Sequence, residues 1–137
     1  MGEPEMRRLL EERHHGVLVT LKRDGRPQLS NISYALADGV IRISVTDGRA
    51  KTANLRRDPR ASLHVTSDDF WSYVVAEGHG DLTPPAADPG DATVDELVEL
   101  YRSVQGEHED WDDFRAAMVR DRRLVIRIPV GRLYGMA

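Results

Sequence analysis

The residues best suited to bind a ligand lie in one short cationic segment, residues 49–60. The segment reads RAKTANLRRDPR and carries five basic side chains against one acid, a net charge of +4 within a chain whose net charge is −4. A local cationic segment in an acidic protein is typical of a site for one anion, not of a surface for a long polyanion. The segment follows a strand-like run and begins like a helix. Arg49 and Lys51, together with the backbone N–H groups of that helix start, therefore predict a phosphate-binding turn.

Other arrangements that could perform chemistry do not occur in this sequence. The five histidines have no zinc-binding spacing, the chain has no cysteine, and no nucleophile elbow or Walker loop is present. We therefore expect no metal site. A phosphate site without an acid–base pair or a nucleophile is typical of proteins whose chemistry is supplied by a bound cofactor.

Length and composition predict one domain, residues 1–137. Apolar residues make up 40% of the 137 residues and charged residues 31%, which is ordinary for a globular chain. The sequence pI of about 5.7 argues against general binding of nucleic acid, which needs an extended basic face. The first fifteen residues do not resemble a signal peptide, and no apolar run reaches bilayer length. We therefore expect a cytoplasmic protein that does not bind membranes.

Hydrophobic periodicity places strands in the middle of the chain and helices near its ends. Asp-Gly pairs at 24–25, 38–39 and 47–48 mark tight turns, and strands joined by such turns pair antiparallel. The pattern therefore predicts a mainly β protein, a small antiparallel barrel with peripheral helices. Four helices are expected. The first begins near Pro4 and ends at His14 to Gly16, and the second spans about 50–57. The third begins at Thr93, in a capping box with Glu96, and the fourth begins at Asp110. The expected strands cover a hairpin in 16–36 and the runs 40–46, 61–65, 72–82 and 124–135, with Gly78 and Gly80 marking a bulge or a close backbone approach.

Four stretches of the sequence resemble one known family. They read GVLVTLKRDGRPQLSNISY, ISVTDGRAKTANLRRDPRASLHV, WSYVVAEGHGDLTPP and RIPVGRLYG. Together they resemble the split β-barrel flavin and deazaflavin oxidoreductases, the relatives of pyridoxine 5′-phosphate oxidase. The resemblance is strongest to the actinobacterial branch that uses coenzyme F420, an 8-hydroxy-5-deazaflavin. It implies an antiparallel split barrel that forms a homodimer, with two cofactor sites at the subunit interface. It also implies hydride transfer from the reduced cofactor to a small electron-poor organic acceptor.

The resemblance also implies a set of cofactor-binding residues. They comprise ring and ribityl contacts (Gln28, Ser30, Asn31), strand residues that present backbone to the ring (Ser44, Val45), the phosphate-binding turn with its neighbour (Arg49, Ala50, Lys51, Thr52, Asn54), and residues that reach toward the partner's site (Trp71, Tyr73). If Leu29 faces the core, Gln28 and Ser30 share the opposite face of their strand.

The acidic tail of coenzyme F420 carries a phosphodiester and several glutamates, which suits a segment of charge +4. Arg56, Arg57 and Arg60 could meet those glutamates, although a solvated helix face is the slightly better interpretation for these three residues. Two other functions stay open: an FMN protein of the pyridoxamine phosphate oxidase type, and a carrier that binds deazaflavin without catalysis. Gln28 and Ser30 argue against FMN, because they stand where FMN oxidases have basic residues. The donor of any proton to the product also stays open among Tyr73, Ser30 and a solvent water.

Overall fold

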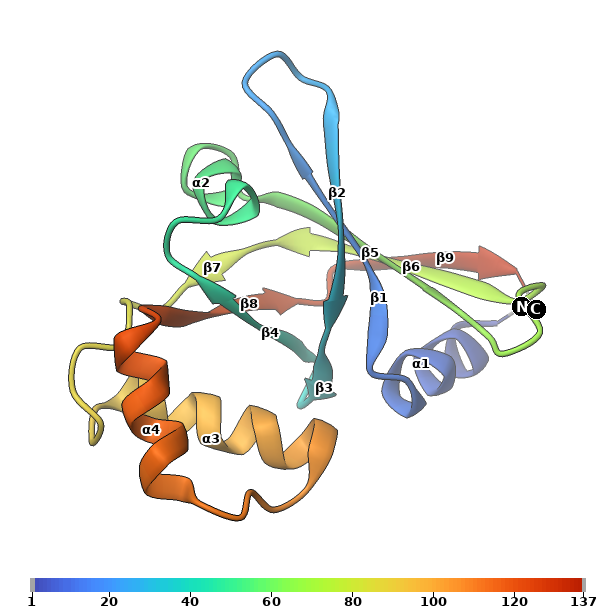
Figure 1. Ribbon diagram of the computed structural model, residues 1–137. Coiled ribbons are helices and arrows are strands. Elements are labelled where there is room, and N and C mark those ends of the chain that lie inside the picture. Colours follow the sequence, from blue (N-terminus) through green and yellow to red (C-terminus); the bar gives the residue numbers. More distant parts are fainter. Residues whose placement is uncertain (1, 137) are drawn as a thin grey trace.

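Two antiparallel sheets form the body of the protein, as a computed structural model that describes residues 2–136 shows (Figure 1). The five-stranded sheet has the order β2-β1-β5-β6-β9, and the four-stranded sheet has the order β3-β4-β8-β7. The first sheet consists of β1 (His15–Leu21), β2 (Pro27–Ser33), β5 (Arg60–Thr66), β6 (Tyr73–His79) and β9 (Arg132–Met136). The second consists of β3 (Ala35–Ala37), β4 (Val40–Thr46), β7 (Asp81–Leu82) and β8 (Arg123–Pro129). All the pairings between these strands are antiparallel, so the prediction of a mainly β split barrel is confirmed.

The barrel core lies between the inner faces of the two sheets. Strand β4 shows the alternation that produces it, since Ile41, Ile43 and Val45 are buried while the residues between them are half-buried. Leu18 and Leu63 meet them from the five-stranded sheet and are fully buried. Each such side chain contributes about 1.5–3 kcal/mol through the apolar area that it removes from water.

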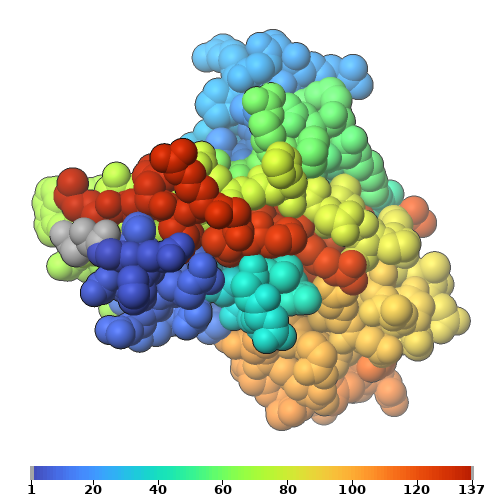
Figure 2. Space-filling view, turned by 180° about the vertical axis from the view of Figure 1, so that it is seen from behind, coloured from blue at the N-terminus to red at the C-terminus, as the bar shows by residue number. Residues whose placement is uncertain are grey.

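Four helices surround the barrel. They are α1 (Glu3–Glu12), α2 (Ala50–Arg57), α3 (Ala92–Gln105) and α4 (Trp111–Arg120). Helix α1 lies beside β9, as Figures 1 and 2 both show. Helices α3 and α4 pack on each other and on β8, where Leu97, Phe114 and Val125 belong to a second hydrophobic cluster. Within residues 2–136, no helix is long and apolar enough to cross a membrane.

Two long runs that the sequence predicts as single strands are each divided between the two sheets. The run 72–82 becomes β6 and β7, separated at Gly80, and the run 124–135 becomes β8 and β9, separated at Val130 and Gly131. A Cβ atom added to Gly78 would lie 2.5 Å from the carbonyl oxygen of Pro129. Only glycine fits at position 78, because the backbone of β6 passes so close to the end of β8. The prediction of a close backbone approach at Gly78 is therefore confirmed.

Two predicted helix boundaries are wrong. Helix α1 ends at Glu12, and His15 and Gly16 already belong to β1, because antiparallel pairing with β2 begins at His15. Helix α3 is capped by Asp91, whose carboxylate accepts a hydrogen bond from the Val94 N–H, and not by a capping box that starts at Thr93. The Thr93 hydroxyl instead donates to the carbonyl of Pro84. The predicted start of α4 is confirmed, since Asp110 accepts from the N–H of Asp113.

Candidate cofactor site

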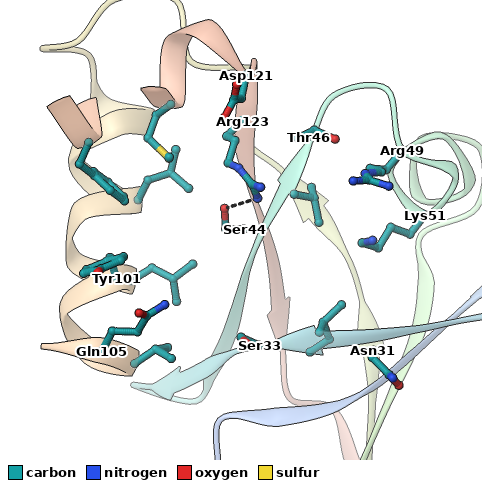
Figure 3. A pocket seen from close by; sticks show the side chains of 17 residues that line it. Asn31, Ser33, Ser44, Thr46, Arg49, Lys51, Tyr101, Gln105, Asp121 and Arg123 are labelled. Atoms are coloured by element: carbon teal, nitrogen blue, oxygen red, sulfur yellow. Dashed lines mark hydrogen bonds between the residues drawn. The ribbon is translucent and has the colours of Figure 1, made fainter. Parts of the chain in front are cut away.

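A cavity of about 580 Å³ lies between the α3–α4 helix pair on one side and β4, the end of β2 and the start of α2 on the other (Figure 3). One side, which we call the strand wall, is polar and cationic, and the other, the helix wall, is apolar along most of its length. The strand wall is formed by Asn31, Ser33, Ser44, Thr46, Arg49, Lys51 and Arg123. The helix wall is formed by Leu97, Leu100, Tyr101, Val104, Phe114 and Met118. A ligand that fits both walls has an anionic part and an apolar part.

The geometry of β4 and α2 explains the strand wall. Because β4 buries every second side chain in the barrel, Ser44 and Thr46 point to the opposite face, toward the helix wall. After the turn at residues 47–48, α2 begins with Arg49 at its N-cap position, where no side chain accepts a hydrogen bond from the helix backbone. The first N–H groups of a helix lack partners inside the helix and favour an anion.

Three cations meet at this end of the cavity. Arg49 and Lys51 come from the start of α2, and Arg123 comes from the first position of β8, opposite Thr46 in the β4–β8 ladder. Within residues 2–136, none of the three forms an ion pair with a carboxylate, because the nearby Asp47 and Asp58 pair with other arginines. Burial, followed by the charges of Arg49 and Arg123, lowers the pKa of the Lys51 ammonium. A strand wall that carries these cations without ion pairs could accept an anion.

The whole chain matches one known protein family. The family described as pyridoxamine 5′-phosphate oxidase matches residues 3–136. The chain belongs to this family.

Solved structures agree with this assignment. The chain is 25% identical to a protein described as an F420 reductase, with a TM-score of 0.72 over 93% of this chain and 94% of that one. It is also 25% identical to a conserved hypothetical protein from Mycobacterium tuberculosis, with a TM-score of 0.76 over 98% of this chain and 84% of that one. An FAD-binding protein from Mesorhizobium loti shares the fold at 19% identity, with a TM-score of 0.72 over 98% of this chain and 94% of that one.

Five of the predicted cofactor-binding residues line the same cavity. They are Asn31, Ser44, Val45, Arg49 and Lys51. The Val45 side chain is buried in the barrel. Ala50 is exposed in the first turn of α2, between the two cations. The structure therefore brings the predicted phosphate-binding turn and part of the predicted ring contacts to a single cavity.

Three other residues of this set form a hydrogen-bonded chain beside the cavity. The Asn54 amide donates to the Thr20 hydroxyl at 3.1 Å, Thr20 donates to the Gln28 carbonyl at 3.2 Å, and the Gln28 amide donates to the Ser30 hydroxyl at 3.0 Å. Asn54 and Thr20 are buried, so the chain holds α2 against β1 and β2. Asn54, Gln28 and Ser30 do not line the cavity.

The orientation of β2 corrects the expectation for Leu29. Leu29 does not face the core, since it is 60% exposed and lies opposite Val19 on the outer face of the five-stranded sheet. Gln28 and Ser30 do share one face, but it is the inner face, opposite the buried Thr20 and Leu18. Apolar residues occupy both faces of this sheet, so alternation alone does not identify the inner one.

The remaining predicted residues have other surroundings. Thr52 is buried and its hydroxyl donates to the carbonyl of Thr46 at 2.9 Å, which fastens α2 to the end of β4. Trp71 lies in the turn before β6 and is 75% exposed. Tyr73 stacks on His64 with ring centroids 5.4 Å apart. Neither aromatic residue lines the cavity, so their role across a dimer stays a prediction.

The arginines that follow Lys51 in the cationic segment are occupied by contacts within the protein. Arg56 pairs with Asp47, and Arg60 pairs with Asp58. Arg57 donates to the carbonyl of Leu21 at the base of the β1–β2 hairpin. These contacts favour a structural role for all three residues. The interpretation as a solvated helix face holds for Arg56 and Arg57, but it is wrong for Arg60, which is the first residue of β5. Arg49 and Lys51, in contrast, remain available to a ligand.

Proposed function

We propose that this protein binds coenzyme F420 and transfers a hydride from the reduced cofactor to a small electron-poor organic acceptor. The observation that carries the proposal is the cavity itself. Its strand wall bears Arg49, Lys51 and Arg123, which have no ion-pair partner among residues 2–136, and its helix wall is apolar. An anionic cofactor with a flat ring has the two kinds of surface that these walls match. The likeness to an F420 reductase along nearly the full length of both chains supports this cofactor.

The residues of the cavity have distinct parts in this function. Arg49, Lys51 and the first N–H groups of α2 hold the phosphodiester of the cofactor. Ser44 and the backbone at Val45 lie where the ring would pass between the two walls. The helix wall excludes water from the acceptor side, which strengthens every polar contact inside the cavity. The bound deazaflavin supplies the hydride, and the protein supplies orientation.

The proposal includes a homodimer with cofactor sites at the subunit interface. The outer face of the five-stranded sheet exposes large apolar side chains, Leu29 at 60%, Tyr134 at 45% and Met136 at 58%. Exposed apolar groups on one sheet face are typical of an interface between subunits. Trp71, at 75% exposure beside this face, would then reach toward the cavity of the other subunit.

FMN is a second candidate cofactor, favoured by one specific observation. Three cations in one cavity suit the phosphate monoester of FMN, which carries more charge than a phosphodiester. The two cofactors differ in chemistry, because a deazaflavin with carbon in place of the flavin N5 disfavours one-electron reactions with oxygen.

A titration followed by an acceptor screen tests the proposed function. Purified protein is titrated with coenzyme F420 and with FMN while ring absorbance and fluorescence are followed. Binding of FMN without binding of coenzyme F420 would replace the proposed cofactor. The reduced deazaflavin is then offered with quinones, biliverdin, nitroaromatics and enones. Oxidation by at least one acceptor supports a reductase, and tight binding without any oxidation supports a non-catalytic carrier instead.

A further inference from the structure

Arg123 reaches the cavity through an unusual turn between α4 and β8. The preceding residue, Arg122, has a φ of +51°, in the left-handed region that residues other than glycine rarely adopt. This turn makes Arg123 the first residue of β8, where the ladder places it opposite Thr46, so both residues belong to the cavity face of the sheet. Its guanidinium donates to the Ser44 hydroxyl at 3.2 Å (Figure 3).

Asp47 fastens this turn to the phosphate-binding turn. Its N–H donates to the carbonyl of Arg122 at 3.0 Å, and its carboxylate contacts the side chains of both Arg122 and Arg56. The hydrogen bond from Arg56 is the main reason why the pKa of Asp47 is lowered. Asp47 therefore pairs with two neighbouring arginines that do not line the cavity, and Arg123 has no ion pair among residues 2–136.

The charges that line the cavity do not cancel. Arg49, Lys51 and Arg123 contribute +3 and Asp121 contributes −1, which leaves +2. Asp121 is also the partner of Arg120, 3.6 Å away, so it compensates the three cations only in part. Like charges this close raise the free energy of the ligand-free protein, and a ligand with two negative charges would relieve that repulsion.

We propose that Arg123 is a third anion-binding residue of this cavity and that, with Arg49 and Lys51, it selects ligands whose anionic part carries at least two negative charges. The inference rests on the proposed function for the identity of the ring attached to that anion. Two sources share this chemistry, the phosphate monoester of FMN and the phosphodiester of coenzyme F420 with a neighbouring carboxylate of its tail. The planar guanidinium of Arg123 presents paired N–H groups that can bind two oxygens of one anionic group side by side, a fixed geometry that a lysine ammonium does not offer.

The test compares two variants that remove the same charge from adjacent residues. Arg123→Gln keeps an amide that can donate to Ser44 but loses the charge. Arg122→Gln, the control, removes an exposed charge outside the cavity and keeps the backbone bond to Asp47. Each protein is titrated with FMN and riboflavin, and with coenzyme F420 and the deazaflavin riboside that lacks its phosphoryl tail. We expect Arg123→Gln to weaken the binding of the phosphorylated ligands at least about tenfold, the scale of a lost charge-assisted bond. The affinity for the two unphosphorylated ligands should stay unchanged.

The pair of ligands that responds identifies the source of the anion. A loss of affinity confined to FMN identifies the phosphate monoester as the anion that Arg123 binds. A loss of affinity confined to coenzyme F420 identifies the phosphodiester with its neighbouring carboxylate. An equal loss for phosphorylated and unphosphorylated ligands would overturn the inference, because Arg123 would then only shape the cavity. A loss of the same size in Arg122→Gln would overturn it as well.

A measurement without any cofactor separates this inference from the proposed function. Lys22 and Lys51 are the only lysines of the chain, so selective labelling gives two side-chain NMR signals. In the ligand-free protein, Arg123→Gln should raise the pKa of Lys51 toward its ordinary 10.5, and Arg122→Gln should not. Inorganic pyrophosphate should shift the Lys51 signal in the wild type and shift it less in Arg123→Gln. Lack of any pyrophosphate response in the wild type would overturn the anion site even if a ring binds elsewhere.

Discussion

Lys51 offers a clean test of the anion site, because the ligand-free protein gains nothing from its charge. Its ammonium is half-buried beside Arg49 and Arg123 and has no carboxylate partner among residues 2–136. The variant Lys51→Met keeps the length of the side chain and removes the charge. Loss of one charge-assisted hydrogen bond to the cofactor should weaken binding by about 1–3 kcal/mol. This corresponds to a Kd that rises about 5- to 150-fold.

The same substitution should not lower the stability of the ligand-free protein. Burial and the two neighbouring arginines lower the pKa of Lys51 from 10.5 in the folded state, so the folded protein holds this proton less tightly than the unfolded chain does. The resulting penalty on folding is fully present below the lowered pKa and disappears as the pH rises above the ordinary value. At pH 7 the Lys51→Met protein should therefore have a Tm equal to or higher than that of the wild type.

Fluorescence titration and thermal unfolding of the same samples give both quantities. Lys22→Met is the matched control, because Lys22 is exposed at the end of the β1–β2 hairpin and lies outside the cavity. We expect the control to change neither Kd nor Tm. An unchanged Kd in Lys51→Met would refute the role of Lys51, and a large fall in Tm would show that the residue is structural.

Three further predictions concern the elements that position the site. Glu96→Gln should lower the free energy of unfolding at pH 7 by about 1–3 kcal/mol, whereas the exposed Glu109→Gln should not, because Glu96 binds two arginines of the sheet. Hydrogen bonding to Arg127 is the main cause of the lowered pKa of Glu96. The stability that the Glu96 carboxylate contributes is therefore present above the ordinary pKa near 4.5 and is lost as the pH falls through the lowered pKa. Urea unfolding curves of the wild type and of Glu96→Gln that stay separated at low pH would contradict this. Gly78→Ala should lower Tm by at least about 4 °C, because the added Cβ would lie 2.5 Å from the carbonyl oxygen of Pro129. An unchanged Tm in calorimetry would mean that β6 and β8 can move apart at this crossing. Leu29→Asp should convert the proposed dimer to a monomer in sedimentation velocity. A dimer that persists in this variant would exclude this sheet face as the interface.

Local signals in the sequence predict the cationic turn because everything it needs is local. Strand β4, the turn at 47–48 and the start of α2 follow one another in the chain, so Arg49 and Lys51 come to one place whatever the rest of the fold does. The tight Asp-Gly turns likewise predict antiparallel pairing without knowledge of the core.

The remainder of the site depends on contacts between distant parts of the chain. Arg123 enters the cavity because of its register with Thr46 on β4, and a register between strands so far apart cannot be read from periodicity. The helix wall depends on how α3 and α4 pack on β8. Glu96 looked like part of a helix cap in the sequence, yet in the structure it binds Arg42 and Arg127 and fixes α3 against the sheet.

A crystal structure of the protein with coenzyme F420 bound tests the central claim most directly. We predict that the phosphodiester lies within hydrogen-bonding distance of Arg49 or Lys51, with the guanidinium of Arg123 turned toward the same anionic part of the cofactor. The ring should lie between Ser44 and the helix wall. A cofactor bound elsewhere, with these three side chains facing only solvent, would contradict the account.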